Sequence, residues 1–457
     1  MFWQQFMKRG SVPWAAATAL CMLAMAHSAT AAPTLEEVAR GVKVDENKIS
    51  VSGISSGAFM AHQFHVAHSD HIMGAGIVAG GPYYCARGNI LDAVTRCSSF
   101  VMLECKKLKL DPKWCETKTN LAPKTKTQVE GVAKQSFLEA KKQEAAGNIS
   151  KLTNLADDKI HLFSGTYDAI VPQSVMDAVY HFYVDNDKGG VDAKNVDQNA
   201  GFPAPHTMVR DAFDKPSGDV VGNCRPPWPP VDKNSFIDDC AQVAGQQQNT
   251  NGCICPPAPA TGASCPPPNK QALCKDLNDV DLAGAILKRI YGGAALKNER
   301  VNVPESEVLA FDQKGLFSEF SNKPFNAWQD ASMAREGYVF IPKACKEGKQ
   351  CRLHVAFHGC LQGGQTDKRP GHSGNLFSKY AGYNEWAAAN DIVVLYPQVM
   401  IRNLDPINPQ GCWDWWGQNY THEGYHTKQG KQIKAVAQMI NVLAGGQKLL
   451  DVPLEGR

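Results

Sequence analysis

The segment at residues 49–57 most constrains how this chain can fold. An alternating, β-prone stretch runs into Gly53-Ile54-Ser55-Ser56-Gly57, and residues 58–61 then open a predicted helix. Only Ser55 has glycine two residues before it and two after it, the spacing of a tight strand-to-helix turn that exposes a serine hydroxyl. The pattern predicts that Ser55 is a nucleophile, and the alternative is an ordinary Ser/Gly turn.

A serine hydroxyl needs a histidine to take its proton and an acid to orient that histidine. Asp168 follows a predicted strand at 160–165, where an open parallel sheet presents its functional groups, so we expect it to be the acid rather than only a helix cap. His206 leaves a Pro/Gly-rich loop and is the expected base. The competing histidines are His181, His422 and His426, with His426 the next choice.

The tripeptide His358-Gly359-Cys360 follows an apolar predicted strand at 353–357. An oxyanion-binding loop belongs at such a position, and the backbone N–H groups of Ser56 and Cys360 are the expected donors. The alternative is a β-turn that carries a disulfide cysteine, and both descriptions are compatible.

The order of these parts along the chain is unusual. In ordinary α/β-hydrolases the oxyanion loop precedes the serine, the acid and the histidine, whereas here it follows all three. We therefore expect an α/β class protein with a circularly permuted α/β-hydrolase fold and a mostly parallel central sheet. Three further patterns support this fold. They are strand signals at 337–341 and 392–396, a helical run at 380–390 that would form a parallel crossover, and a final helix at 429–443.

A tryptophan-rich loop lies near the C-terminus, at residues 411–417. Three tryptophans in so short a turn-rich segment are not all expected in the core, so at least one should line an apolar cleft. The candidate substrate-binding residues are Trp413, Trp415 and Trp416. A disulfide between Cys360 and Cys412 would hold this loop beside the oxyanion loop.

The N-terminus and the cysteines indicate export. Residues 1–32 combine basic residues, an apolar run and small residues, which is typical of a secretory signal peptide. The 15 cysteines less Cys21 leave an even set, best interpreted as disulfides of a secreted or periplasmic protein. We expect residues 33–457 to form one catalytic domain with a Cys/Pro-rich insertion at about 216–280.

Charge and ligand patterns restrict the partners. The net charge of +2 gives no strong field for polyanions, so we expect no nucleic-acid partner, and no later stretch is long enough to span a membrane. Cys253-Ile254-Cys255 has the wrong spacing for zinc. Four histidines recur every third residue and cannot share one helix face, so we expect surface and packing roles, no metal and no cofactor; they are His62, His65, His68 and His71.

The chain resembles the catalytic domain of secreted poly(3-hydroxybutyrate) depolymerases, in particular single-domain, circularly permuted members. The segments that carry the resemblance are the Ser55 box and residues 338–342, 354–360, 383–387, 394–398 and 411–416. The resemblance implies a Ser55, His206 and Asp168 triad, with the Ser56 and Cys360 amides as oxyanion hole. It implies a monomeric serine esterase for a polyester or hydroxyalkanoate oligomer, and the alternatives are a carboxylesterase of feruloyl or acetyl esters and a non-enzymatic binding protein.

Overall fold

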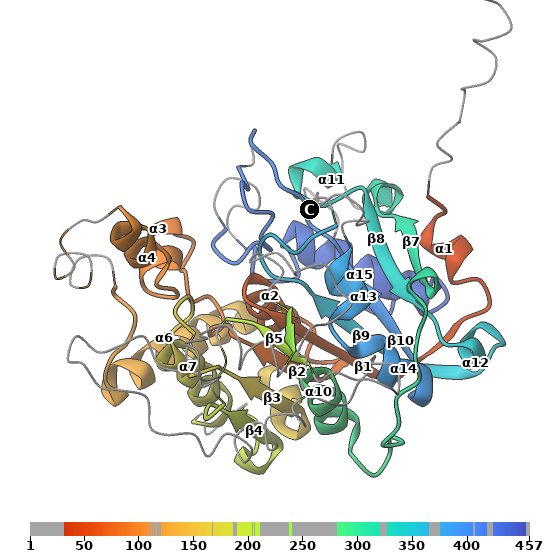
Figure 1. Cartoon of the computed structure of the whole chain (residues 1–457), viewed down its shortest axis with the longest axis horizontal. Helices are drawn as coiled ribbons and strands as arrows, with labels where there is room; N and C mark the ends of the chain where they lie inside the picture. Colours follow the sequence, from red (N-terminus) through yellow and green to blue (C-terminus); the bar gives the residue numbers. More distant parts are fainter. Residues whose placement is uncertain are drawn as a thin grey trace, which may run out of the picture. The chain divides into compact units, whose positions relative to one another are not determined.

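The central sheet of this protein contains eight strands in the computed structural model (Figure 1). The described residues are 32–108, 111, 113, 116, 120–166, 168–185, 190–202, 204, 206–210, 237–239, 281–319, 327–364, 375–404, 407–417 and 424–453. The predicted signal peptide and almost all of the predicted Cys/Pro-rich insertion lie outside them. From one edge to the other the order is β4 (Val196–Asn199), β3 (Lys159–Phe163), β2 (Ile72–Val78), β1 (Lys43–Ile54), β9 (Gln350–Phe357), β10 (Ile392–Tyr396), β8 (Glu336–Phe340) and β7 (Val308–Asp312).

Neighbouring strands from β4 to β10 are parallel, and β8 and β7 add an antiparallel edge. The carboxyl ends of β1, β2, β3 and β9 therefore meet at one edge of the sheet, which is where an open parallel sheet places its functional loops. β5 (Met208–Arg210) and β6 (Ile237–Asp239) form a short separate sheet of two parallel strands.

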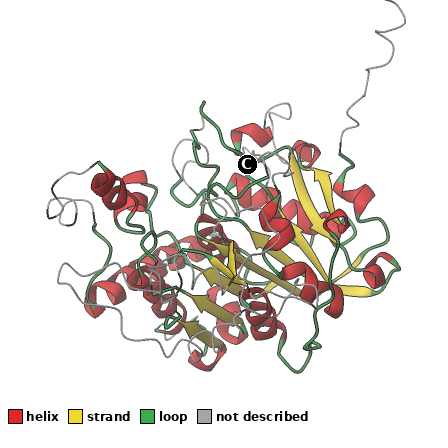
Figure 2. Cartoon of the chain, in the orientation of Figure 1, coloured by secondary structure: helices red, strands yellow, loops and turns green. Residues whose placement is uncertain are grey.

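Helices cover both faces of the sheet (Figure 2). One face packs against α2 (Ser56–Ala67), α7 (Gln173–Val184) and α15 (Lys431–Leu443), with α6 (Lys126–Ala145) against α7. The other face packs against α10 (Leu282–Tyr291), α13 (Leu376–Tyr380) and α14 (Tyr383–Asn390). Shorter elements are α1 (Leu35–Val38), α3 (Ile90–Thr95), α4 (Phe100–Lys107), α11 (Ala327–Asp330), α12 (Lys343–Lys346), and 3-10 turns at Leu152–Asp157, Ala193–Asn195, Glu305–Glu307 and Lys314–Glu319.

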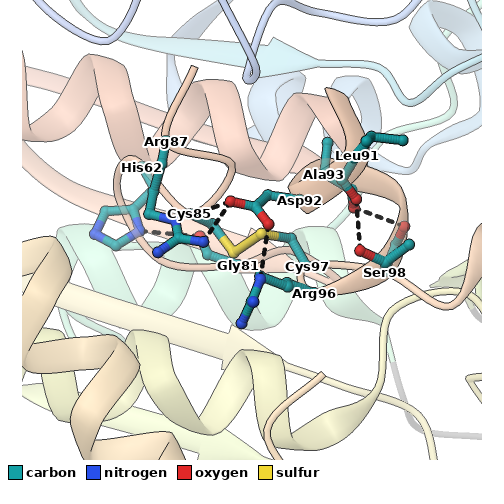
Figure 3. The surroundings of a disulfide bond; sticks show 11 residues. His62, Gly81, Cys85, Arg87, Leu91, Asp92, Ala93, Arg96, Cys97 and Ser98 are labelled. Atoms are coloured by element: carbon teal, nitrogen blue, oxygen red, sulfur yellow. Dashed lines mark hydrogen bonds and ion pairs between the residues drawn. A yellow bond between two sulfur atoms is a disulfide. The ribbon is translucent and has the colours of Figure 1, made fainter. Parts of the chain in front are cut away.

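The helical pair α3 and α4 is inserted after β2. A disulfide between Cys85 and Cys97 closes the loop that carries α3, and Asp92 accepts hydrogen bonds from both Arg87 and Arg96 (Figure 3). The disulfide and the ion pairs therefore hold this loop in a closed form, and Ala86, Ala93 and Cys97 pack in one buried cluster with Phe59 of α2.

The predicted permuted fold is confirmed. Reading the chain from β7 to its end and then from β1 to β4 restores the ordinary sequence of oxyanion loop, serine, acid and histidine. Consistent with this, α1 at the start of the described chain packs against α15 near its end. The expected parallel crossover between β9 and β10 is also confirmed.

The helix expected at 380–390 is confirmed over residues 383–390, and only its expected start is wrong. Gly382 has a φ of 92°, a left-handed conformation that ends α13 and begins α14. Glycine reaches this region without a Cβ clash, so the run breaks into two helices at this residue.

The expected surface role of the α2 histidines is also wrong. His62, His65 and His68 are all fully buried, because α2 lies between the sheet and its neighbouring helices. His65 contacts the Tyr183 hydroxyl at 2.8 Å and Asp158 at 2.9 Å. Within the described ranges, no three His, Cys, Asp or Glu side chains converge as metal ligands do, and no helix has the length and apolar composition to cross a bilayer.

Burial of His68 predicts a pH-dependent stability. Burial lowers the pKa of His68 to about 3, with Lys428 adding to the effect. Below pH 6.5 the unfolded chain binds a proton at His68, whereas the folded chain does not. The free energy of unfolding therefore falls as the pH drops towards 3, by at most about 1.4 kcal/mol per pH unit for this group. We expect His68→Leu to reduce this slope, measured by urea unfolding between pH 4 and 7, by up to the amount that the binding of one proton contributes. Equal slopes in the two proteins would contradict it.

Candidate active site

Ser55 lies at the turn between β1 and α2. Its backbone has φ 57° and ψ −125°, a strained conformation for a residue with a side chain. The Ser55 N–H donates to the Val78 carbonyl at the end of β2, at 3.0 Å, which holds the turn against the neighbouring strand. The structure thus places Ser55 in the tight strand-to-helix turn that the glycine spacing predicted.

The two glycines of the box are sterically required. A Cβ on Gly53 would lie 2.2 Å from the Gly57 carbonyl oxygen. A Cβ on Gly57 would lie 2.3 Å from the His358 carbonyl oxygen and 2.4 Å from that of Phe357. Gly57 thus lets the first turn of α2 approach the end of β9 at backbone contact distance.

The loop after β9 lies directly beside Ser55. Strands β1 and β9 pair in parallel with Gly53 opposite Phe357, so His358 and the residues after it leave the sheet next to the serine turn. A Cβ on Gly359 would lie 3.2 Å from the Ser55 Cβ. The structure brings together the two segments that lie about three hundred residues apart in the sequence.

His358 orients this loop, a role that sequence reasoning missed. The Val399 N–H donates to His358 Nε2 at 3.2 Å, so the ring proton is on Nδ1 and is donated to the Gly359 carbonyl at 2.7 Å. Burial lowers the pKa of His358 to about 4, which keeps this neutral form at neutral pH. In a trans peptide the C=O and N–H groups point in opposite directions, so the Cys360 N–H points away from the imidazole.

The amides of Ser56 and Cys360 differ from the Gly359 amide in their hydrogen bonding. Among the described residues, neither N–H donates to a protein acceptor, whereas the Gly359 N–H is taken by Gln362 Oε1 at 2.6 Å. Ser56 begins α2, where the helix dipole favours negative charge. Two such amides are suited to hold an anionic oxygen.

Asp168 and His206 form a hydrogen-bonded pair. Asp168 Oδ2 lies 2.8 Å from His206 Nδ1, and the carboxylate side chain is fully buried. Its other oxygen accepts from the N–H groups of Ile170 and Val171, both at 2.9 Å. With Nδ1 held by the carboxylate, Nε2 is the ring nitrogen through which His206 would act as a base.

Two contacts fix the loops that carry this pair. Gln173 donates to the carbonyls of Ser164 and Ala200, at 3.0 and 2.6 Å, and so joins the loop after β3 to the loop after β4. Ser99, between α3 and α4, donates its N–H to the Ile170 carbonyl at 2.7 Å. The apolar residues around His206 share one buried cluster with Ile54, next to Ser55; they are Phe202, Ala204 and Met208.

The competing histidines occupy other surroundings. His181 lies on α7 and contacts Asp185. His426 is buried among tyrosines, with Nε2 3.6 Å from Glu139, and its pKa is lowered by burial. His422 lies outside the described residues.

The expectation that the three tryptophans cannot all be buried is wrong. Trp413 has no exposed surface and packs against Phe357, so it is a core residue and not a substrate contact. Trp415 and Trp416 keep only 8% and 7% of their surface exposed, and Trp415 stacks on Phe59 at 4.0 Å. The segment buries all three because it packs between α2 and the cysteine-linked loops.

The expected disulfide between Cys360 and Cys412 is confirmed, and Cys345 also pairs with Cys351. The first link ties the tryptophan loop to the residue whose amide faces away from His358. A cavity of about 760 Å³ lies elsewhere, beside β4 and α10, and its lining includes Asp197, Lys288 and Trp386 rather than Ser55.

Comparison with known proteins gives two similar depolymerases. A poly(3-hydroxybutyrate) depolymerase of Delftia acidovorans is 31% identical over 435 residues, which cover 94% of this chain. A polyhydroxybutyrate depolymerase of Talaromyces funiculosus is 27% identical over 417 residues, covering 88% of this chain and 91% of that protein. The chain is similar to poly(3-hydroxybutyrate) depolymerases over most of its length. It spans 65% of the length of the Delftia relative, and no family model matches it.

Solved structures of PHB depolymerases share the fold. The PHB depolymerase from Penicillium funiculosum superposes with a TM-score of 0.59 at 26% identity, and covers 91% of this chain and 99% of that one. A serine-to-alanine variant of a PHB depolymerase complexed with an R3HB trimer gives a TM-score of 0.58 at 25% identity, with the same coverage.

The close approach of α2 to β9 predicts the effect of adding one methyl group. Gly57→Ala would place a Cβ against two backbone carbonyls, so we expect it to lower the free energy of unfolding by about 1–3 kcal/mol or more. Gly131→Ala, exposed within α6 with no atom near its Cβ, should instead raise it by about 0.5–1 kcal/mol. Urea unfolding measures both, and equal stability of Gly57→Ala and wild type would contradict the packing argument.

Proposed function

We propose that the protein is an exported serine esterase that hydrolyses the ester bonds of poly(3-hydroxybutyrate) or its oligomers. The observation that carries the proposal is the buried Asp168–His206 pair at the same sheet edge as the strained Ser55 turn. The similar depolymerases, one of them complexed with an R3HB trimer, support a hydroxyalkanoate substrate. The disulfides support export, because such links persist in oxidising compartments.

In the proposed mechanism Ser55 Oγ attacks the ester carbonyl while His206 Nε2 takes its proton. Asp168 holds the imidazole through Nδ1 and stabilises the positive charge that the ring acquires. The amides of Ser56 and Cys360 hold the negative oxygen of the tetrahedral intermediate. His206 then gives the proton to the departing alcohol, and a water molecule hydrolyses the acyl-enzyme by the same steps in reverse.

The apolar wall of the proposed site comes from the tryptophan loop. Trp415 and Trp416 lie in one apolar cluster with Phe59, Val171 and the Cys360–Cys412 disulfide. This cluster brings together the helix that follows Ser55, the loop of Asp168 and the proposed oxyanion loop. The exposed edges of the two tryptophans are suited to the methyl groups of a hydroxybutyrate chain. We propose these two residues, without Trp413, as substrate contacts of a monomeric catalytic domain at residues 33–457.

The nucleophile assignment predicts the result of a single substitution. Ser55→Ala should lower the clearing of an amorphous poly(3-hydroxybutyrate) film at least about a thousandfold and abolish labelling by a fluorophosphonate probe. Ser69→Ala, which loses only a hydroxyl that donates to the Lys151 carbonyl, is the control. Clearing that survives Ser55→Ala would refute the assignment, and release from feruloyl or acetyl esters without film clearing would identify the other esterase class.

The hydrogen bonds of His358 predict a loss in turnover. His358→Phe removes the donor that holds the Gly359 carbonyl, so the Cys360 amide should lose its orientation and kcat should fall about 10- to 100-fold with little change in KM. His358→Gln, which offers an amide donor, should recover part of the loss. Kinetics on p-nitrophenyl butyrate measure this, and an unchanged kcat in His358→Phe would exclude the role.

A further inference from the structure

A buried chain of polar side chains crosses the sheet just below the proposed site. Ser50 and Ser52 lie on β1, three to five residues before Ser55, and His354 lies on β9, four residues before His358. Side chains two residues apart on a strand point to the same face. Here that face is the one covered by α10, which ends at Tyr291, and α14, which begins at Tyr383.

The contacts within the chain are short and continuous. His354 lies 2.7 Å from Ser50 through Nδ1 and 2.7 Å from Ser52 through Nε2. Ser50 contacts the Tyr291 hydroxyl at 2.7 Å, and Ser52 contacts the Tyr383 hydroxyl at 2.6 Å. All five side chains are buried.

With a neutral imidazole, only one arrangement of hydrogens satisfies every contact. Tyr291 donates to the Leu353 carbonyl at 2.8 Å and accepts from Ser50, so Ser50 must accept from His354 Nδ1–H. His354 Nε2 then accepts from Ser52, and Ser52 accepts from Tyr383. Each hydroxyl donates once and accepts once, except Tyr383, which donates at the end of the chain. Burial supports this neutral state, because it lowers the pKa of His354 to about 3 and raises those of both tyrosines.

These positions are unusual for a central parallel strand. Such strands are buried on both faces and are normally apolar throughout, and a buried polar group gains little stability over an apolar one even when it is satisfied. What a fully satisfied network adds is a fixed geometry. The chain bonds the serine strand to the oxyanion strand laterally, and it bonds both strands to two helices.

We propose that this chain of Tyr383, Ser52, His354, Ser50 and Tyr291 is a positioning device that sets the distance between Ser55 and the Cys360 amide. The proposal rests on the proposed esterase function. Because Ser52 is separated from Ser55 by two residues, a shift of β1 against β9 moves the nucleophile relative to the oxyanion donors. Loosening the chain should then lower transition-state stabilisation, with little effect on substrate binding.

The test compares two buried tyrosines on the same face of the sheet. Tyr383→Phe removes the donor to Ser52, whereas Tyr396→Phe removes a hydroxyl that donates to Asn384 at 2.7 Å outside the chain. On p-nitrophenyl butyrate we expect Tyr383→Phe to lower kcat at least fivefold and Ser52→Ala at least tenfold, with KM within twofold of wild type. Tyr396→Phe should keep kcat within twofold while losing comparable thermal stability.

A spectroscopic readout tests the hydrogen arrangement independently of any ester. In wild type the His354 imidazole should show ¹⁵N shifts of a neutral ring protonated at Nδ1 from pH 5 to 8, and Ser52→Ala should change this pattern. A ring protonated at Nε2, or a kcat loss equal in Tyr383→Phe and Tyr396→Phe, would overturn the proposal. If Ser52→Ala does not fold, the two tyrosine variants still decide. A wild type that turns over p-nitrophenyl butyrate but no hydroxybutyrate ester would contradict the proposed substrate and leave the positioning result standing.

Discussion

The parallel pairing of β1 with β9 is the interaction on which the rest of the structure depends. It places Gly53 opposite Phe357 and so brings the Ser55 turn and the loop after β9 to the same edge of the sheet. The strained backbone of Ser55 persists because this pairing, the Val78 contact and the start of α2 all hold it. Without the pairing, neither the Gly57 approach to β9 nor the contact of Gly359 with Ser55 would exist.

The positions of Asp168 and His206 depend on further contacts. Both lie on loops, which are positioned less rigidly than strands, and the structure compensates with specific polar contacts. Gln173 joins the two loops, and Ser99 joins the acid loop to the inserted pair α3 and α4. The Cys85–Cys97 and Cys360–Cys412 disulfides then hold the outer loops against this group. The geometry of the proposed site thus depends on disulfides, which persist in oxidising compartments.

Buried polar groups are frequent around the site and act in opposite directions with pH. Burial lowers the pKa of four histidines, which are His62, His68, His354 and His358. Because only the unfolded chain binds protons at these residues, they lower the free energy of unfolding as the pH falls. Asp414, in the tryptophan loop, has its pKa raised to about 7 by burial. Because the unfolded chain releases this proton at a lower pH, the Asp414 carboxyl lowers the free energy of unfolding as the pH rises from about 4 to 7.

The sequence by itself determined the turn at Ser55 and the permuted order of the segments. The Gly53–Gly57 spacing required a tight turn at Ser55, the strand before Asp168 placed an acid at a sheet edge, and the late His358-Gly359-Cys360 loop required a permuted connection. These inferences succeeded because they depend on backbone sterics and strand order, which short patterns encode. The disulfide between Cys360 and Cys412 followed from the same arrangement.

Only the tertiary structure decided which side chains are buried and what they contact. Trp413 and the α2 histidines looked suited to a cleft or a surface, yet packing from several distant segments covers them. The roles of His358 and of the chain around His354 were invisible in the sequence, because each depends on a partner more than forty residues away. The partners of Gln173 are nearer in the sequence, but they belong to two different loops. Hydrogen-bond partners of this kind are fixed only when the sheet has assembled, and no local pattern records them.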